Sequence, residues 1–166
     1  MNGKNLLIIG AGQYGAVASE TAEAMGCFSK ISFLDDHNPM AIGRISELET
    51  FVQEYANIFV AIGNPEIRLE WIEKAEKIGY GIATLISTKA YISPSARLLK
   101  GSIVEPCAVI QSNATVGLGC IISSGAVINH NAIIGRGCHI DCNATVAARM
   151  EVPLKTKVES GKVYRE

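Results

Sequence analysis

A six-residue repeat in the second half of the chain restricts its fold more than any other feature of the sequence. Every sixth residue from Ile92 to Val158 is aliphatic, and the fourth residue after most of them is small. An α-helix repeats a face about every 3.6 residues and a strand about every 2, so neither explains this period. A short strand followed by a turn does, with one aliphatic side chain per repeat pointing inward. Three such sides make a triangular coil, and coils stack about 4.8 Å apart into a parallel β-helix.

The first half of the chain has a different pattern, in which short apolar runs alternate with helix-forming segments. This alternation predicts a parallel sheet with crossover helices. The expected strands are 6–9, 31–34, 58–62 and 82–86, and the expected helices are 16–25, 45–55 and 66–78. The chain is therefore divided into an α/β domain at 1–87 and a β-helix domain at 88–166. The last rung of the second domain contains Pro153, Lys155 and Lys157, and is expected to form an irregular C-terminal cap.

Composition argues against several classes of function. The net charge is −1 and the basic residues are scattered, so nothing favours nucleic acid or an anionic membrane surface as a partner. The first apolar run is too short for a signal peptide or a membrane span, and a cytoplasmic protein is expected. Five cysteines without any C-x-x-C motif argue against a disulfide framework or a zinc site, so no metal is expected.

Two groups of residues suggest a ligand site in the first half. Gly10, Gly12 and Gly15 follow the first expected strand, where their backbone N–H groups could approach a phosphate at a helix N-terminus. Asp35, at the end of the second strand, is placed for a sugar hydroxyl or a base edge. The pattern also fits an NAD site, but four strands are too few for both halves of a dinucleotide fold. A single nucleoside diphosphate fits better, with ligand-free tight turns as the plainer alternative.

His130 is the best candidate for catalysis in the second half. It comes two residues after the inward Ile128 and is expected to face outward. An amine or hydroxyl becomes a good nucleophile only when it loses a proton, and imidazole is a suitable base near neutral pH. An exposed histidine without a role is the alternative. Three convergent histidines would suggest a zinc lyase of the carbonic anhydrase type, but the repeat offers only His130 and His139.

Several motifs occur together over residues 4–146, and they resemble those of bacterial sugar acetyltransferases, a family that includes sialic-acid O-acetyltransferases and UDP-amino-sugar N-acetyltransferases. The motifs are Gly10-Ala11-Gly12-x-x-Gly15, Phe33-Leu34-Asp35-Asp36, Ala61-Ile62-Gly63-Asn64-Pro65-x-x-Arg68, Ile92-Ser93-Pro94-Ser95-Ala96, Val127-Ile128-Asn129-His130 and Ile134-Gly135-x-x-x-His139-Ile140. The resemblance implies a Rossmann-like α/β domain followed by a short left-handed β-helix. It also implies a homotrimer that moves an acetyl group from acetyl-CoA to an amine or hydroxyl of a UDP- or CMP-linked sugar, in surface-polysaccharide or glycan biosynthesis.

The resemblance also assigns roles to individual residues. His130 and Asn131 take the catalytic positions, and His139 and Ser123 are expected near acetyl-CoA. Apart from the resemblance, the basic side chains of the last coils, Arg149, Lys155 or Lys157, are expected near the phosphates of CoA. The nucleotide-sugar is expected to contact Gly10, Gly12, Tyr14, Gly15, Asp35, Asp36, Gly63, Asn64 and Arg68.

Two positions depart from the family pattern. Asn131 stands where a carboxylate is usual, and Ser123 stands where an asparagine is common. These departures keep open a second function, a non-catalytic trimer that binds a nucleotide-sugar.

Overall fold

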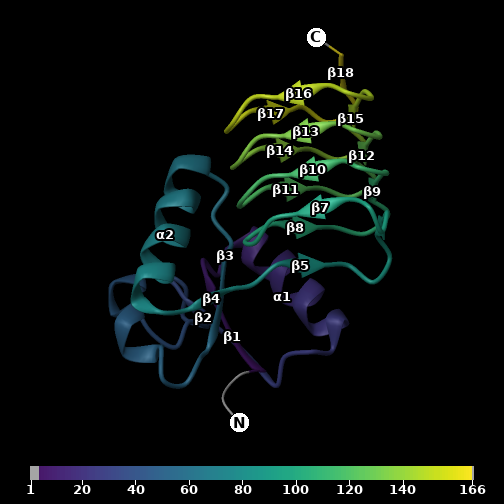
Figure 1. The fold of residues 1–166 in the computed structure, drawn as a ribbon. Coiled ribbons are helices and arrows are strands. Elements are labelled where there is room, and N and C mark those ends of the chain that lie inside the picture. Colours follow the sequence, from purple (N-terminus) through teal and green to yellow (C-terminus); the bar gives the residue numbers. More distant parts are fainter. Residues whose placement is uncertain (1–3, 166) are drawn as a thin grey trace. The chain divides into compact units, whose positions relative to one another are not determined.

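The computed structural model describes residues 4–165, so the outer ends of the two expected domains, residues 1–3 and 166, lie outside the described part. The chain forms two compact units, and the boundary between them along the sequence lies between residues 85 and 86. Both units are visible in Figure 1, and each is described by itself below.

The first unit is a parallel sheet with helices between its strands. Its strands are in the order β2-β1-β3-β4, so the chain leaves the central β1 for one neighbour and later returns to the other. Hydrophobic strand residues fill the core: Leu6 and the three residues after it are fully buried. The elements are β1 (Asn5–Ile9), α1 (Gln13–Met25), β2 (Lys30–Leu34), η2 (Ile45–Phe51), β3 (Asn57–Val60), α2 (Pro65–Ile78) and β4 (Gly81–Ile82).

Local sequence explains where the two α-helices end. Gly26 and Gly79 follow α1 and α2 in the left-handed conformation, with φ of 65° and 111°, which glycine adopts readily. Helix α2 begins at Pro65, directly after Asn64, whose side chain caps the first turn.

Two predicted elements of this unit differ from the structure. The helix expected at 45–55 is a 3₁₀ helix, η2, that ends at Phe51. A turn follows, and after it Tyr55 is buried, with its hydroxyl donating to Oγ of Ser32 at 2.7 Å. The single strand expected at 82–86 is two strands: β4 completes this sheet, and β5 begins the next unit. Ile86 lies six residues before Ile92, so it is already in phase with the repeat.

The second unit is a parallel β-helix built from two-residue strands. Within the described residues these strands form three parallel sheets, β16-β13-β10-β7, β17-β14-β11-β8-β5 and β18-β15-β12-β9-β6. The strands are β5 (Leu85–Ile86), β6 (Tyr91–Ile92), β7 (Arg97–Leu98), β8 (Ile103–Val104), β9 (Val109–Ile110), β10 (Thr115–Val116), β11 (Ile121–Ile122), β12 (Val127–Ile128), β13 (Ile133–Ile134), β14 (His139–Ile140), β15 (Thr145–Val146), β16 (Glu151–Val152), β17 (Lys157–Val158) and β18 (Val163–Tyr164).

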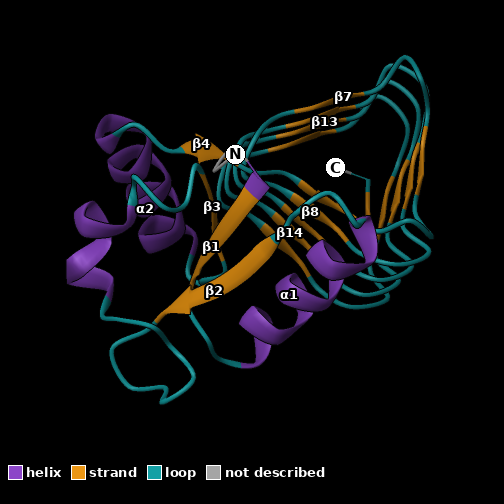
Figure 2. Cartoon of the chain, turned by 90° about the horizontal axis from the view of Figure 1, so that it is seen from below, coloured by secondary structure: helices purple, strands orange, loops and turns teal. Residues whose placement is uncertain are grey.

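The repeat fixes which side chains point into the β-helix. The second residue of each strand points inward, and from Val104 to Val152 these residues are at most 1% exposed. Each strand pairs with the strand eighteen residues further along, as Tyr91 does with Val109. In Figure 2 the coils lie over one another in a triangular outline. The first residue of each strand points away from this core, so such residues eighteen positions apart form columns. In one of these columns Leu85, Ile103 and Ile121 are nevertheless buried.

Corners with a left-handed backbone join the strands. The third residue after an inward position has positive φ at Asn113, Asn131, Asn143 and several glycines. Glycine and asparagine tolerate this conformation best, which explains their recurrence in the repeat. The irregular cap expected at the end of the chain is not observed. Strands β16 to β18 continue the coil regularly, because Val152 and Val158 keep the inward position while the lysines point outward.

Candidate active site

His130 stands on an exposed corner of the β-helix, directly after strand β12. Neighbouring coils hold the backbone of this corner. The N–H of Asn131 donates to the carbonyl of Ser112 at 3.0 Å, and the N–H of Arg149 donates to the carbonyl of His130 at 3.1 Å. The main chain is therefore fixed on both sides, while the imidazole remains open to a ligand.

Asn131 is the side-chain partner of this imidazole. Its Nδ2 lies 3.0 Å from Nδ1 of His130, and its backbone has a φ of 58°. A carboxylate at this place could only accept a hydrogen bond, so it would keep the proton on Nδ1 and leave Nε2 as the base. An amide offers a donor or an acceptor after a half turn of its side chain. Asn131 therefore orients the ring of His130 but is compatible with either tautomer.

Ser123 and His139, the two side chains expected near acetyl-CoA from the resemblance, lie together in the structure. Oγ of Ser123 is 3.0 Å from Nε2 of His139, because β11 and β14 are neighbours in one sheet. Two acids missed in the sequence complete the group. Glu105 accepts hydrogen bonds from Ser124, and Asp141 lies 3.7 Å from Nε2 of His139. These acids could have been found in the sequence, because positions 105, 123 and 141 are eighteen residues apart and therefore lie in one column.

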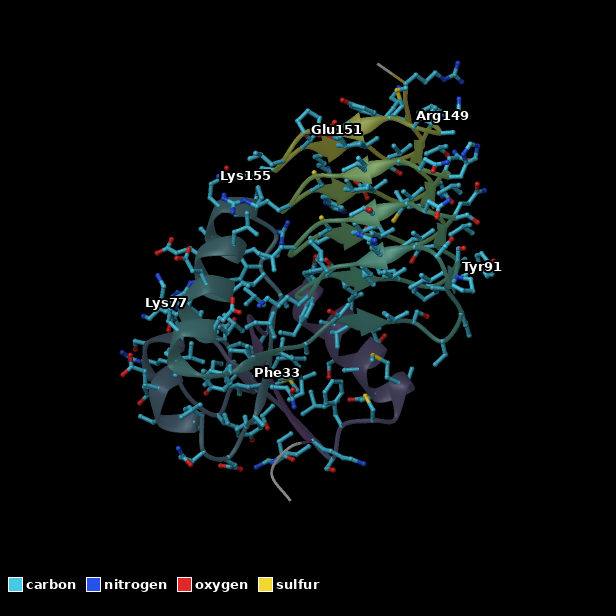
Figure 3. The ribbon with its side chains drawn as sticks, in the orientation of Figure 1. Phe33, Lys77, Tyr91, Arg149, Glu151 and Lys155 are labelled. Atoms are coloured by element: carbon cyan, nitrogen blue, oxygen red, sulfur yellow. The ribbon has the colours of Figure 1, made fainter. Side chains whose placement is uncertain are left out.

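His130 and His139 are presented by different sides of the β-helix. His130 follows β12, His139 begins β14, and the intervening β13 belongs to a third sheet. Arg149 is at the corner one coil beyond Asn131, with a φ of 64°, and its side chain is exposed. Figure 3 places Arg149 and Lys155 on opposite sides of the last coils. Of the residues expected near acetyl-CoA, Arg149 is thus the one nearest in the coil to His130.

The three glycines after β1 have different structural roles. Gly10 has a φ of 96° and donates its N–H to the carbonyl of Leu34. Gly15 packs against Gly10 so closely that a Cβ would overlap the carbonyl oxygen of Gly10. Gly12, which caps α1 with an ordinary φ of −77°, has no atom within 4 Å of the place of a Cβ. Gly12 therefore borders open space, whereas the hydroxyl of Tyr14, in the first turn of α1, is buried.

Asp35 is bonded to the protein's own backbone. Its carboxylate accepts the N–H groups of Ala11 at 2.8 Å and of His37 and Asn38 at 2.9 Å. The side chain of Asn38 donates back to the carbonyl of Ala11 at 2.6 Å, which closes a ring of hydrogen bonds. The bonds from Ala11 and His37 hold the pKa of Asp35 below its ordinary value. Asp35 thus shapes the glycine loop. The neighbouring Asp36 accepts the N–H of Ile45 at 3.1 Å.

The loop after β3 is fixed from inside by a buried arginine. Arg68 is 1% exposed, and its Nη1 donates to the carbonyls of Ile62 and Gly63 at 2.7 and 2.8 Å. The side chain of Asn64 accepts the N–H of Ile67 as the cap of α2. Because β1, β2 and β3 are neighbours, the loops at residues 10–15, 35–38 and 62–64 meet at one edge of the sheet.

No group of three or more His, Cys, Asp or Glu side chains suited to a metal ion occurs in residues 4–165. In the same part of the chain, no helix combines the length and the apolar character needed to cross a membrane.

Comparison with known families identifies the first unit. The PglD N-terminal domain family matches residues 5–75. This range contains all the loops at the edge of the sheet.

Comparison with solved structures covers almost the whole chain. PerB from Caulobacter crescentus, in complex with CoA and GDP-perosamine, is 25% identical and has a TM-score of 0.84 over 98% of this chain and 89% of its own. The acetyltransferase domain of PglB from Neisseria gonorrhoeae is 27% identical, with a TM-score of 0.74 over 98% of this chain and 91% of its own. In complex with acetyl coenzyme A, that domain is 26% identical, with a TM-score of 0.66 over 96% of this chain and 89% of its own. Residues 5–75 therefore carry a PglD N-terminal domain, and the chain as a whole is similar in architecture to PerB and to the acetyltransferase domain of PglB.

Proposed function

We propose that this protein transfers the acetyl group of acetyl-CoA to an amine of a nucleotide-linked sugar, as a step in the synthesis of a surface polysaccharide or another glycan. The observation that carries the proposal is the exposed imidazole of His130, held on a rigid corner and oriented by Asn131. The similar structures of PerB and the PglB domain, with CoA and GDP-perosamine or with acetyl coenzyme A, support the choice of substrates.

In the proposed reaction, His130 takes a proton from the attacking nitrogen. The nitrogen forms a bond to the acetyl carbon, the bond from that carbon to sulfur breaks, and the CoA thiolate leaves and is protonated. A general base of this kind contributes about 10²- to 10⁴-fold in rate. Nε2 accepts the proton when Asn131 turns its oxygen toward Nδ1 of His130.

Asn131, the neutral partner of the proposed base His130, favours an amine over a hydroxyl as the acceptor group of the sugar. A neutral amine is already nucleophilic and loses its proton easily once it has attacked, whereas a hydroxyl needs a stronger base at the start. A carboxylate beside the histidine would strengthen the base by stabilising the imidazolium, which the neutral amide of Asn131 does less well. We therefore place N-acetylation first and O-acetylation second.

We propose that the first unit is a Rossmann-like domain that holds the nucleotide. Its strand order reverses at β1, and in open parallel sheets ligands bind at such a point, outside the carboxyl ends of the strands. The open space at Gly12 and the start of α1 suit a diphosphate. Since Asp35, Asn64 and Arg68 are bonded to backbone, we infer that they shape this site and that Tyr14 and Asp36 lie closer to the sugar-nucleotide. UDP-, CMP- and GDP-linked sugars are all to be tested.

We also propose a homotrimer that works in the cytoplasm, where acetyl-CoA and nucleotide-sugars are made. The outward column of the sheet β18-β15-β12-β9-β6 is largely apolar and continuous. It consists of Tyr91, Val109, Val127, Thr145 and Val163. Tyr91 and Val163 are 58% and 47% exposed, and Figure 3 shows Tyr91 on the lower coils. Burial of such a column between copies of the chain would also bring the His130 corner close to another subunit. Sedimentation is expected to give about three times the monomer mass.

The decisive experiment measures thiol release from acetyl-CoA in the presence of nucleotide-sugars, with mass spectrometry of the product. Release is expected with a nucleotide-linked amino-sugar, and the matched nucleotide-sugar with a hydroxyl in place of the amine serves as the control. Turnover of the hydroxyl compound alone would make the protein an O-acetyltransferase. Tight binding of nucleotide-sugar with no turnover of either compound would favour the non-catalytic trimer, the second candidate that Asn131 keeps open.

A further inference from the structure

The imidazole of His139 lies between two oxygen atoms from consecutive coils. Oγ of Ser123 is 3.0 Å from Nε2, and Oδ1 of Asp141 is 3.7 Å from the same nitrogen. The side chain of His139 is 29% exposed. Asp141 comes two residues after His139, directly after the end of β14 (His139–Ile140). Nothing in the family resemblance assigns a role to Asp141.

Glu105 sets the direction of the hydrogen bond between Ser123 and His139. This acid is only 9% exposed, and it accepts both the N–H and the hydroxyl of Ser124, at 3.0 and 3.1 Å. Its other oxygen accepts the hydroxyl of Ser123 at 3.5 Å. A serine whose proton goes to a carboxylate offers a lone pair to its other neighbour. Ser123 therefore accepts from Nε2 of His139, and the proton of the ring stays on this nitrogen.

Asp141 is itself held as an anion. Its Oδ1 accepts the N–H of Cys142 at 2.7 Å, and its Oδ2 is 3.2 Å from Nζ of Lys157 on the next coil. Although partial burial raises it, the pKa of Asp141 lies below its ordinary value because of these two groups and the nearby His139. Lys157 also contacts Glu159, at 2.7 Å. Its ammonium is therefore shared between two acids.

We propose that Asp141 and Glu105 are positioning residues for His139, which they hold in one orientation with its proton on Nε2 and in an environment that favours the charged ring. The inference rests on the proposed function for the ligand, the thioester of acetyl-CoA. When an amine attacks the thioester, negative charge develops on the carbonyl oxygen. Because His130 and His139 lie on different sides of one β-helix, the imidazole beside that oxygen would be the His139 of a neighbouring copy in the proposed trimer. A fixed cationic ring there stabilises the transition state more than the substrate. Asp141 and Glu105 act only through His139, either directly or by way of Ser123.

The test compares Asp141→Asn with Glu159→Gln. Asparagine keeps the shape of Asp141 and the acceptor for Cys142 but removes the charge near His139. Glu159 stands one coil further in the same column and contacts Lys157 at 2.7 Å. Each variant is studied as the intact chain. Two readouts are used: the nitrogen resonances of the imidazole rings as a function of pH, and the kinetics with acetyl-CoA.

We expect Asp141→Asn to move the titration midpoint of the His139 ring to lower pH and to reduce kcat about tenfold or more, with an unchanged KM for the nucleotide-sugar. Glu159→Gln should change neither. An unmoved His139 titration in Asp141→Asn would overturn the inference, whatever the activity. If the wild type turns over no sugar, the proposed function fails, but the ring titration still decides whether Asp141 controls His139.

Discussion

In the α/β unit the polar side chains at the sheet edge are bonded to the protein's own backbone, whereas in the β-helix unit the backbone is bonded and the side chains project outward. Asp35, Asn64 and Arg68 all hold loops in place. In the β-helix, backbone hydrogen bonds join each coil to the next, and the side chain of His130 projects from this hydrogen-bonded backbone. The first unit is therefore suited to present backbone N–H groups to a ligand, and the second to present side chains.

The largest effect is expected at His130, and it tests whether a side chain of the β-helix unit carries out catalysis. His130→Ala should lower kcat by about 10²- to 10⁴-fold, because the base acts mainly in the transition state. The affinity for acetyl-CoA, measured by calorimetry, should change little, and sedimentation should show the same assembly. Full activity in this variant with a good acceptor would place the base elsewhere.

Gly12 and Gly15 test whether the backbone of the loop after β1 binds the ligand. Gly15→Ala should destabilise the α/β unit by about 1–3 kcal/mol, because its Cβ would overlap the carbonyl oxygen of Gly10. Trp71, the one tryptophan of the chain, lies in α2 and reports unfolding of this unit in urea by its fluorescence.

Gly12→Val is the matched variant, since its Cβ meets no protein atom within 4 Å. It should cost less stability than Gly15→Ala, since only the less favourable valine at the N-cap of α1 is involved. It should lose binding of the nucleotide-sugar, because the new side chain occupies the place of the phosphate. Undiminished affinity in Gly12→Val would show that the glycine loop is only a turn.

A smaller effect is expected at the partner of the base. Asn131→Asp should raise kcat about tenfold by fixing the tautomer of His130 and stabilising its charged form. Aspartate also tolerates the left-handed corner, where φ is 58°. Asn113→Asp, one coil earlier and with the same φ, is the control and should leave the rate unchanged. Equal rates for wild type and Asn131→Asp would mean that proton transfer does not limit turnover.

The smallest effect is the response of the glycine loop to acid. The pKa of Asp35 in the folded loop lies below the ordinary value of 3.8, so its bonds stabilise the loop above that pH and are lost as the pH falls through the lowered pKa. Nucleotide-sugar affinity should therefore hold from neutral pH to about pH 5 and weaken progressively below pH 4. In Asp35→Asn the affinity should be reduced already at neutral pH. An Asp35→Asn variant with wild-type affinity at all pH values would show that the loop keeps its shape without this carboxylate.

The β-helix could be predicted from sequence because each repeat determines its own strand, turn and inward residue. The outward position of His130 is confirmed, since its place in the repeat fixed it. The prediction began one strand too late because the run at 82–86 looked like one strand. It expected a cap because Pro153, Lys155 and Lys157 look irregular in sequence, although they occupy positions outside the core of a regular coil. One coil has about eighteen residues, so Ser123 and His139 come close together on consecutive coils.

The details of the α/β unit depend on contacts between loops, which the sequence does not display. No periodicity indicates that Asp35 bonds to Ala11 or that Asn38 closes the ring. Cys120 and Cys138 lie in the hydrophobic core of the β-helix, and their thiols also donate to the carbonyls of Gly135 and Pro153 at 3.1 and 2.9 Å, contacts that no sequence pattern indicates.

The left-handed corner at residue 131 also limits how this enzyme can evolve. Glycine, asparagine and aspartate are the residues that occupy such a corner with least strain, and of these only aspartate is an acid. The codons of asparagine and aspartate differ in their first base alone. A single point mutation therefore separates the present amide from a carboxylate beside His130, so selection can adjust the strength of the base without disturbing the scaffold.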